Sequence, residues 1–278
     1  MQRLNPPRCA VVGSPIGHSL SPVIHRAAYT ALGLEWDYQA IELQPPEFGP
    51  FVDGLDEPWR GLSVTMPLKE EAARCGEPSD DVRLTGAANT VILEQQGRRV
   101  YNTDIAGFGE ALASAGIPAG LPALIVGNGA TARSAFVALA RTGSRSITLT
   151  GRRPEGVAEF WRWASWSGID PKELAWGSAP DSDTRLIIST VPAAGAAGVV
   201  EALTENAERL VALFDAIYHP WPTTLAARVS DRGATVLSGL DLLVHQAAHQ
   251  ILLMTGHQVE IEVLTSAVRA ELRRRADA

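Results

Sequence analysis

The sequence predicts an α/β protein of two domains, and three observations support this. Short apolar runs alternate with helical patterns along residues 1–104, which is typical of a mainly parallel sheet. A loop rich in glycine and proline at 116–122 marks a domain boundary. After that loop, apolar runs recur at regular spacing with helical patterns between them. We therefore expect a second, doubly wound parallel sheet, with a cleft between the two domains.

The first domain is expected to hold strands at 9–13, 36–43, 61–65, 90–93 and 99–102. The last two would form a hairpin around Gly97. Helices are expected after Ser21, from Pro67 and from Asp104. The pattern is helical again from Leu240 to the end of the chain, and we assign these helices to the first domain. The predicted domains are thus 1–104 with 240–278, and 105–239.

The second domain is expected to hold strands at 123–126, 146–150, 186–189, 211–214 and 234–237. The first of them runs directly into the pattern G-x-G-x-x-A, before a helix at 134–141. In this context Gly127 makes a tight turn, Gly129 lets the backbone approach a pyrophosphate, and Ala132 keeps the helix close to the sheet. The domain resembles a Rossmann-type sheet, and the pattern predicts dinucleotide binding.

The next strand indicates which dinucleotide is preferred. An acidic residue at its end would bind the ribose 2′-hydroxyl of NAD. This strand ends instead in Thr150-Gly151-Arg152-Arg153. Two guanidinium groups suit a 2′-phosphate through charge-assisted hydrogen bonds. We therefore expect NADP rather than NAD.

An anion site is predicted near the N-terminus, between Gly13 and Pro22. Ser19 and Ser21 place two hydroxyls just ahead of a helix that starts with Pro22, and we predict Ser21 as its N-cap. A carboxylate there would meet free backbone N–H groups, the positive end of the helix dipole and both hydroxyls. An ordinary capped helix is the alternative.

Two further residues suggest acid–base chemistry. Lys69 lies in the first turn of the helix expected from Pro67, and Asp104 follows the predicted hairpin. A lysine that faces the positive end of a helix dipole is favoured as a proton donor and acceptor. A carboxylate that met this lysine would orient it. Taken singly, the two residues could equally be a surface lysine and a helix cap.

Composition excludes several classes of function. The net charge of −7 and the pI near 5.4 argue against a nucleic-acid partner. No apolar stretch is long enough for a membrane span. Cys9 and Cys75 are isolated, which fits the cytoplasm and gives no structural metal site. We expect a cytoplasmic protein without metal.

Several motifs, in order along nearly the whole chain, resemble those of the shikimate dehydrogenase family. They are G-x-P-I-x-H-S-x-S-P-x-x-H at Gly13–His25, V-T-x-P-x-K at Val64–Lys69, G-A-x-N-T at Gly86–Thr90, N-T-D-x-x-G at Asn102–Gly107, the glycine-rich loop at Gly127, D-x-x-Y-x-P-x-x-T at Asp215–Thr223, and G-L-x-x-L-x-x-Q at Gly239–Gln246. The chain departs from the family pattern at Ser63, Asn128, Gly151 and Leu242.

The resemblance implies roles for residues that match these motifs. Lys69 and Asp104 correspond to the catalytic pair, with the lysine as acid and base for the substrate hydroxyl. Substrate contacts are implied for Ser19, Ser21, Thr65, Lys69, Asn89, Asp104, Tyr218 and Gln246. Cofactor contacts are implied for Asp80, Gly127, Asn128, Gly129, Ala130, Thr131, Gly151, Arg152, Arg153, Ala216 and Gly239.

The activity implied by the resemblance is the reversible NADPH-dependent reduction of 3-dehydroshikimate to shikimate, on the route to chorismate and aromatic amino acids. The enzyme would be a monomer or homodimer. One alternative is a quinate/shikimate dehydrogenase that uses NAD, against which the two arginines argue. A folate-linked dehydrogenase would leave the serine pair and Asn89 without a role. A non-catalytic NADP sensor would need neither Lys69 nor Asp104.

Overall fold

The computed structural model describes residues 6–170 and 172–277. The chain divides into two compact units, the first reaching to Gly107 and resuming at Leu243, and the second spanning Phe108–Leu242. The divisions fall inside two helices, α5 (Asp104–Ser114) and α11 (Gly239–Thr255). Each of these helices therefore contributes residues to both units.

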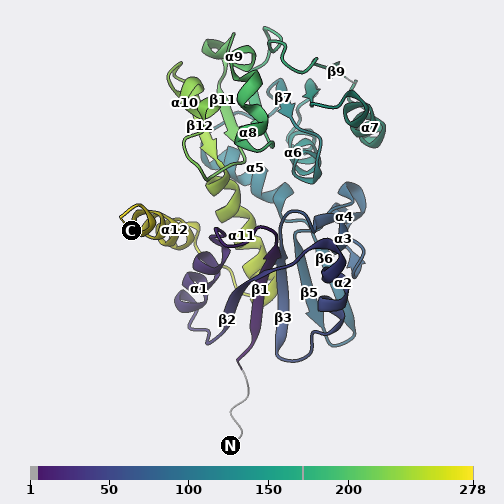
Figure 1. Ribbon diagram of the computed structural model, residues 1–278, viewed down its shortest axis with the longest axis vertical. Coiled ribbons are helices and arrows are strands. Elements are labelled where there is room, and N and C mark those ends of the chain that lie inside the picture. The colour runs from purple at the N-terminus through teal and green to yellow at the C-terminus, as the bar shows by residue number, and fades with distance from the viewer. Residues whose placement is uncertain (1–5, 171, 278) are drawn as a thin grey trace, which may run out of the picture. The chain divides into compact units, whose positions relative to one another are not determined.

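The sheet of the first unit has the strand order β2-β1-β3-β5-β6-β4 (Figure 1). Parallel pairs join β1 to β2 and β3, and β4 to β6, while β5 runs antiparallel to β3 and β6. The predicted mainly parallel sheet and the β5–β6 hairpin are confirmed. The strands are β1 (Arg8–Gly13), β2 (Asp37–Glu42), β3 (Trp59–Val64), β4 (Glu77–Pro78), β5 (Thr90–Glu94) and β6 (Gly97–Tyr101).

The helices of the first unit are α1 (Ser21–Ala31), α2 (Pro45–Asp53), α3 (Lys69–Ala72), α4 (Asp80–Thr85), most of α11, and α12 (Ile261–Ala276). The prediction that Ser21 is an N-cap is wrong: α1 begins at Ser21, and Leu20 is its N-cap residue. The Ser21 N–H is instead held by Ser19 Oγ at 3.3 Å. Helix α12 packs against α1, and α3 starts at Lys69, two residues after the position expected for it.

Apolar side chains on both faces of this sheet are buried. One cluster joins Leu62, Val91 and Val100 to Phe48 and Val52 of α2. The other joins Val11 to the aromatic residue Tyr38 and to Met254 of α11, among others. Burial on both faces explains why the parallel strands read as continuous apolar runs in the sequence.

The second unit contains a fully parallel sheet in the order β12-β11-β10-β7-β8-β9. Counted from β7, this is the strand order of a Rossmann-type sheet, as predicted. Five of its strands lie where they were expected, to within one residue at each end, and the short β9 was not anticipated. The strands are β7 (Ala123–Val126), β8 (Ile147–Thr150), β9 (Lys172–Glu173), β10 (Leu186–Ser189), β11 (Ala212–Asp215) and β12 (Thr235–Ser238).

The helices that accompany this sheet are α6 (Ala130–Arg141), α7 (Pro154–Ala164), α8 (Ala193–Ala196), α9 (Val200–Leu203) and α10 (Thr224–Ser230), with 3₁₀ turns at Ser165–Ser167, Ala197–Val199 and Ala207–Arg209. Helix α6 begins four residues earlier than predicted, because Gly129 has the extended backbone of an N-cap. Phe136 of α6 meets Phe160, Trp161 and Trp163 of α7 edge to face, which joins the two helices.

Candidate active site

One edge of the first unit's sheet gathers most of the polar residues expected to act on a substrate. Parallel strands β1 and β3 both end there. The antiparallel strand β5 begins there, because Thr90 pairs with Ser63 of β3 and with Tyr101, the last residue of β6. The segments that follow β1, β3 and β6 and the one that precedes β5 are thereby brought together.

Close contact between two of these segments requires a glycine at the end of β1. A Cβ on Gly13 would collide with Thr65 Cγ2 and lie 2.8 Å from the Met66 carbonyl oxygen. The backbone is also joined here, because Ser14 N donates to the Met66 carbonyl at 3.0 Å and Thr65 N to the Val12 carbonyl at 2.9 Å. The serine segment after β1 is thus tied to the segment that leads to Lys69.

The central feature of this edge is an ion pair between Lys69 and Asp104. Lys69 Nζ lies 2.6 Å from Asp104 Oδ2, and the two side chains are 16% and 5% exposed. The Lys69 carbonyl also accepts from Ala88 N at 2.8 Å, which holds the lysine backbone next to the segment before β5. The structure therefore brings together the two residues for which acid–base chemistry was expected.

Asn89 supports the carboxylate from the other side. Its Nδ2 lies 2.9 Å from Asp104 Oδ1, 2.9 Å from Thr103 Oγ1 and 3.1 Å from Gln246 Oε1. Its Oδ1 accepts from Thr103 N at 2.9 Å. Asn89 is 2% exposed, so its carboxamide is held by partners rather than by water. Both Asp104 oxygens are therefore hydrogen-bonded, one to the lysine and one to the asparagine.

Gln246 belongs to the same group. This residue of α11 is 7% exposed, and its Nε2 donates to the Leu243 carbonyl of its own helix at 3.0 Å. Thr103, which the sequence analysis did not single out, contacts Gln246 Oε1 at 3.3 Å. The family motif N-T-D contains Thr103, but its chemistry alone gave no reason to separate it from a structural threonine.

The predicted anion site is only partly as expected. Ser21 is 5% exposed, while Ser19 is half-buried, and the Ser21 N–H is held by Ser19 Oγ. The residue Thr65, which follows β3, is also half-buried. These three residues lie on the segments that follow β1 and β3. Their hydroxyl groups are therefore carried by the same edge of the sheet as Lys69.

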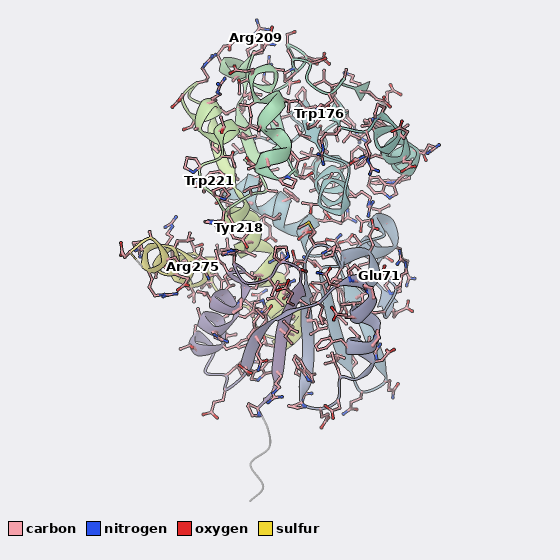
Figure 2. All side chains as sticks on the ribbon, viewed as in Figure 1. Glu71, Trp176, Arg209, Tyr218, Trp221 and Arg275 are labelled. Carbon is pink, nitrogen blue, oxygen red and sulfur yellow. The ribbon has the colours of Figure 1, made fainter. Side chains whose placement is uncertain are left out.

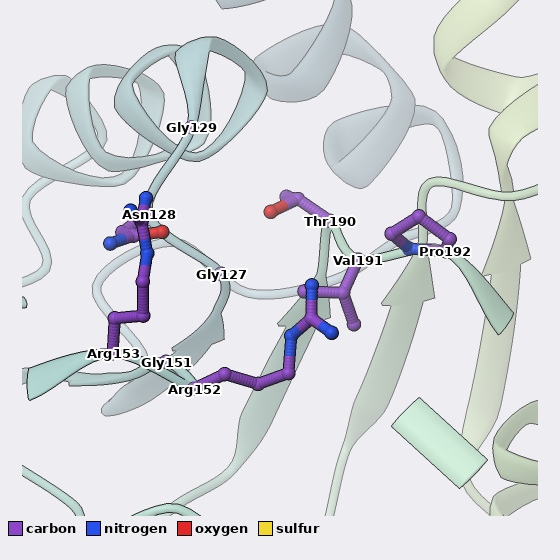
Figure 3. A pocket seen from close by; sticks show the side chains of 9 residues that line it. All are labelled: Gly127, Asn128, Gly129, Gly151, Arg152, Arg153, Thr190, Val191 and Pro192. Carbon is purple, nitrogen blue, oxygen red and sulfur yellow. The ribbon is translucent and has the colours of Figure 1, made fainter. Parts of the chain in front are cut away.

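In the second unit, a cavity of about 450 Å³ lies at the carboxyl ends of β7, β8 and β10 (Figure 3). Its lining is Gly127, Asn128, Gly129, Gly151, Arg152, Arg153, Thr190, Val191 and Pro192. Six of these nine were predicted from the glycine-rich loop and the arginine pair. The Arg153 side chain extends toward Asn128, and that of Arg152 toward Val191 (Figure 3). The cavity thus combines a glycine turn with two guanidinium groups.

The remaining three lining residues follow β10 and were missed. Gly127 has φ +113°, and a Cβ there would collide with Thr190 Oγ1. Thr190 Oγ1 also donates to the Val126 carbonyl at 3.1 Å. The sequence did carry a signal for these lining residues, because Thr190-Val191-Pro192 directly follows a strand that was predicted. No pairing partner was assigned to this strand from the sequence, and in the structure it lies beside β7.

The other residues implied in cofactor binding lie outside this lining. Ala130 and Thr131 open α6, and Gly239 opens α11, where its N–H donates to the Ile217 carbonyl at 3.0 Å in the loop that begins at Ala216. Tyr218 belongs to that loop, as does Trp221 (Figure 2). Asp80 belongs to the first unit, where its exposed side chain opens α4 and lies 3.9 Å from Arg83.

Within residues 6–170 and 172–277, no three histidine, cysteine or acidic side chains form a group that could hold a metal ion. In the same part of the chain, no helix has the length and apolar character needed to cross a membrane.

Each unit offers one of the chemistries that a dehydrogenase combines. The lysine–carboxylate pair at the sheet edge of one unit can give and take a proton. The cavity of the other unit offers what a dinucleotide with an extra phosphate needs, namely close backbone approach and two guanidinium groups.

Comparisons with known proteins identify the family of this chain. Residues 11–91 match the model of the shikimate dehydrogenase substrate binding domain. A shikimate dehydrogenase (NADP(+)) from Methanothrix thermoacetophila is 36% identical over 95% of this chain and 97% of its own. The crystal structure of Mycobacterium tuberculosis shikimate dehydrogenase has a TM-score of 0.87 and 39% identity, covering 95% of this chain and all of that one.

A further solved structure carries ligands. The shikimate 5-dehydrogenase from Thermus thermophilus, in complex with NADP(H) and shikimate, has a TM-score of 0.80 and 29% identity, covering 95% of this chain and 99% of that one. Since 95% of this chain is covered in each case, the similarity to these relatives spans both units. This chain therefore belongs to the shikimate dehydrogenase family.

Proposed function

We propose that this protein catalyses the reversible NADPH-dependent reduction of 3-dehydroshikimate to shikimate, in the biosynthesis of chorismate and aromatic amino acids. The observation that carries the proposal is the ion pair between Lys69 and the buried Asp104, in a chain whose relatives, matched over nearly their whole length, are named shikimate dehydrogenase (NADP(+)). Bound NADPH would supply the hydride that reduces the carbonyl carbon of the substrate.

Lys69 would exchange the proton of the reacting oxygen. In the direction of reduction, the ammonium group gives a proton to the substrate oxygen as the carbonyl becomes an alcohol, and the lysine becomes a neutral amine; in oxidation the amine takes that proton back. Asp104 holds Nζ at 2.6 Å, so the lysine needs little reorientation before it reacts. Pre-organised geometry of this kind lowers the barrier because the ordering of the groups is complete before the reaction.

The neighbouring polar groups would orient the substrate. Asn89 Nδ2 lies against both Asp104 Oδ1 and Gln246 Oε1. Asn89 and Gln246 are proposed as substrate contacts, because a carboxamide offers both a donor and an acceptor to ring hydroxyls. Ser19, Ser21 and Thr65 carry hydroxyls suited to a carboxylate or to further ring hydroxyls. Tyr218, in the other unit, is proposed as a further substrate contact. A site built from so many polar groups discriminates strongly against an analogue that lacks a hydroxyl.

The second unit would bind the cofactor. We propose that Gly127, Asn128, Gly129, Ala130 and Thr131 contact the pyrophosphate, while Arg152 and Arg153 bind the 2′-phosphate. Asp80, Gly151, Ala216 and Gly239 are proposed as further contacts. The residues around the cavity fit the cofactor, because they combine close backbone approach with positive charge and offer no carboxylate in its lining.

We place the reaction in the cytoplasm and expect a monomer or homodimer. Cys9 and Cys75 are free, which suits a reducing compartment. Burial raises the pKa of each thiol to about 11, so both thiols remain protonated and weakly reactive. Light scattering of the purified protein would give the oligomeric state.

The test of the proposed function is steady-state kinetics with shikimate and quinate, each against NADP⁺ and NAD⁺ in one buffer. We expect the highest kcat/KM for shikimate with NADP⁺. Equal efficiency for quinate with NAD⁺ would instead assign the chain to the quinate/shikimate branch. Tight NADP⁺ binding without turnover of either acid would identify a sensor.

A further inference from the structure

Gln250 lies in a buried row of hydrogen bonds. The row reaches the sheet edge that carries Lys69 and Asp104, but Gln250 itself is hydrogen-bonded to neither of them. This residue of α11 is 1% exposed, and it bridges strands β3 and β5. Its Oε1 lies 2.7 Å from Ser63 Oγ. Its Nε2 lies 2.9 Å from the Asn89 carbonyl oxygen and 3.1 Å from Thr90 Oγ1.

The partners of this row determine where each hydroxyl proton goes. The Tyr38 hydroxyl donates to Ser63 Oγ at 2.6 Å, which leaves the Ser63 proton for Gln250 Oε1. Gln250 Nε2 can only donate, so Thr90 Oγ1 accepts from it and has its own single proton left to give. That proton goes to Asn89 Oδ1 at 2.9 Å.

The row therefore fixes which end of the Asn89 carboxamide faces the catalytic carboxylate. Asn89 Oδ1 is occupied by donors, the Thr90 hydroxyl and Thr103 N. Asn89 Nδ2 must then point the other way, to Asp104 Oδ1 at 2.9 Å. A flipped carboxamide would place oxygen against a carboxylate and a nitrogen against two donors. Asp104 in turn keeps its second oxygen for Lys69.

We infer that Gln250 is a positioning residue for the catalytic pair: its N–H groups set the direction of the Thr90 hydroxyl and thereby the orientation of the Asn89 carboxamide that holds Asp104. The inference rests on the proposed function, in which Lys69 and Asp104 carry out the proton transfer.

The first test is Gln250→Leu, which keeps the approximate size of the side chain and removes its polar atoms. We expect kcat/KM for shikimate to fall roughly 10- to 100-fold, as small displacements of catalytic groups do. Thr90→Val removes the next link with little change of shape and should cause a similar loss. The double variant should lose no more than the worse single variant, because both changes break the same route.

Tyr38→Phe is the matched control. Tyr38 is fully buried and belongs to the same row, but it lies before Gln250. Its loss leaves the Gln250 N–H groups and the Thr90 hydroxyl unchanged. We expect Tyr38→Phe to lower Tm while leaving kcat/KM within about twofold of wild type, which is the size of effect typical of an uninvolved position.

A second measurement does not depend on turnover. Lys69 and Lys172 are the two lysines of the sequence, and Lys172 is exposed in the second unit, where its Nζ donates to Ser146 Oγ at 3.0 Å. Brief acetylation with acetic anhydride, followed by peptide mass spectrometry, gives the ratio of modified Lys69 to modified Lys172. We expect Gln250→Leu and Thr90→Val to raise this ratio several-fold, because a loosened Asp104 shields Lys69 less, and Tyr38→Phe to leave it unchanged.

The outcomes separate the inference from the proposed function. If wild-type protein does not turn over shikimate, the proposed function fails, and the acetylation ratio still decides the role of Gln250. If Gln250→Leu only lowers Tm, with kcat/KM and the ratio as in wild type, Gln250 is merely structural and the inference is overturned. If Gln250→Leu does not fold, Thr90→Val decides by the same two readouts.

Discussion

Lys69 Nζ lies 2.6 Å from Asp104 Oδ2, although 35 positions separate the two residues in the sequence. The contact arises because Lys69 follows β3 and Asp104 follows β6, and both strands end at the same edge of the sheet with β5 between them. Neither residue depends on a mobile loop for its place, since each is the first residue of a helix. The proposed proton-transfer pair is thus positioned by regular secondary structure.

Lys69→Met should abolish most turnover. Methionine keeps the length of the apolar stem and removes the exchangeable proton, so we expect kcat to fall by about 10²- to 10⁴-fold, the usual contribution of a general acid or base. KM for shikimate should change by much less, because the other substrate contacts remain. Steady-state kinetics at saturating NADP⁺ measure both constants.

Lys172→Met is the matched control for this variant, and it should retain wild-type kinetics. Thermal unfolding should accompany both measurements, because Lys69→Met leaves the Asp104 carboxylate buried without its counter-ion, which costs about 3–5 kcal/mol in typical buried pairs. A folded Lys69→Met protein with near-normal kcat would remove the lysine from the mechanism.

Ser19→Ala should mainly raise KM for shikimate. The hydroxyl group is proposed to hold the end of the substrate that lies far from the reacting carbon. Loss of such a contact weakens the binding of the substrate and of the transition state equally, so KM rises. We expect an increase in KM of roughly 5- to 30-fold, the effect of losing one or two kcal/mol of hydrogen bonding. Ser14→Ala is the control for loss of a nearby serine hydroxyl. The Ser14 hydroxyl donates to Glu42 at 2.8 Å and is not proposed to contact the substrate. A larger effect of Ser14→Ala would contradict the assignment.

Arg152→Gln and Arg153→Gln should change the choice of cofactor. Both side chains line the cavity beside the glycine turn, and each is proposed to bind the 2′-phosphate that distinguishes NADP from NAD. We expect KM for NADP⁺ to rise about 10- to 100-fold per substitution, which corresponds to a charge-assisted hydrogen bond of about 1.5–3 kcal/mol. KM for NAD⁺ should change little.

Arg162→Gln provides the control for loss of one positive charge, because Arg162 is an exposed residue of α7, where its nearest ionic partner is Glu159 at 3.9 Å. Its affinity for both cofactors should match wild type. If Arg152→Gln and Arg153→Gln weaken NADP⁺ and NAD⁺ equally, the two guanidinium groups do not recognise the 2′-phosphate.

The sequence predicted the positions of the strands better than it predicted which strands pair with each other. Strands such as β7 and β10 are short apolar runs with turn residues on either side, a local signal that period and composition reveal. Their adjacency is not local, and for this reason Thr190 was missed while Gly127 was found. No helix was predicted where α2 lies, because its Pro45-Pro46 start and internal Pro50 are typical of turns, although Gln44 and Glu47 form a capping box.

The site was predictable wherever a residue's chemistry is unusual for its place. A lysine at a helix start and paired arginines after a strand are such cases. Thr103 and Gln250 are common residues, and only the hydrogen bonds of the folded chain give them a role. The prediction of Ser21 as N-cap was wrong because Ser21 is already the first residue of α1 and Leu20 is its N-cap residue. The residue at which a helix starts depends on backbone angles that sequence does not reveal.

We expect the buried residue His25 to make the folded protein less stable in acid. Its ring is fully buried and stacks on that of Tyr38, with centroids 4.0 Å apart. Burial lowers the pKa of His25 to about 3, whereas an unfolded chain has the ordinary value near 6.5. As the pH falls below 6.5, the unfolded state takes up a proton that the folded state refuses until about pH 3. Acid therefore favours unfolding through this residue, by up to about 1.4 kcal/mol per pH unit.

His25→Gln removes the titrating group and should flatten this dependence. At pH 7 the variant should be less stable than wild type, because it loses the ring stacking on Tyr38. Between pH 7 and pH 4.5 the difference in unfolding free energy should shrink by about 2–3 kcal/mol, since only wild type bears the cost of keeping a neutral histidine buried. Urea unfolding at several pH values measures the difference. If the two curves run parallel from pH 7 to pH 4.5, His25 becomes protonated in the folded state as easily as in the unfolded chain, and burial does not control its titration.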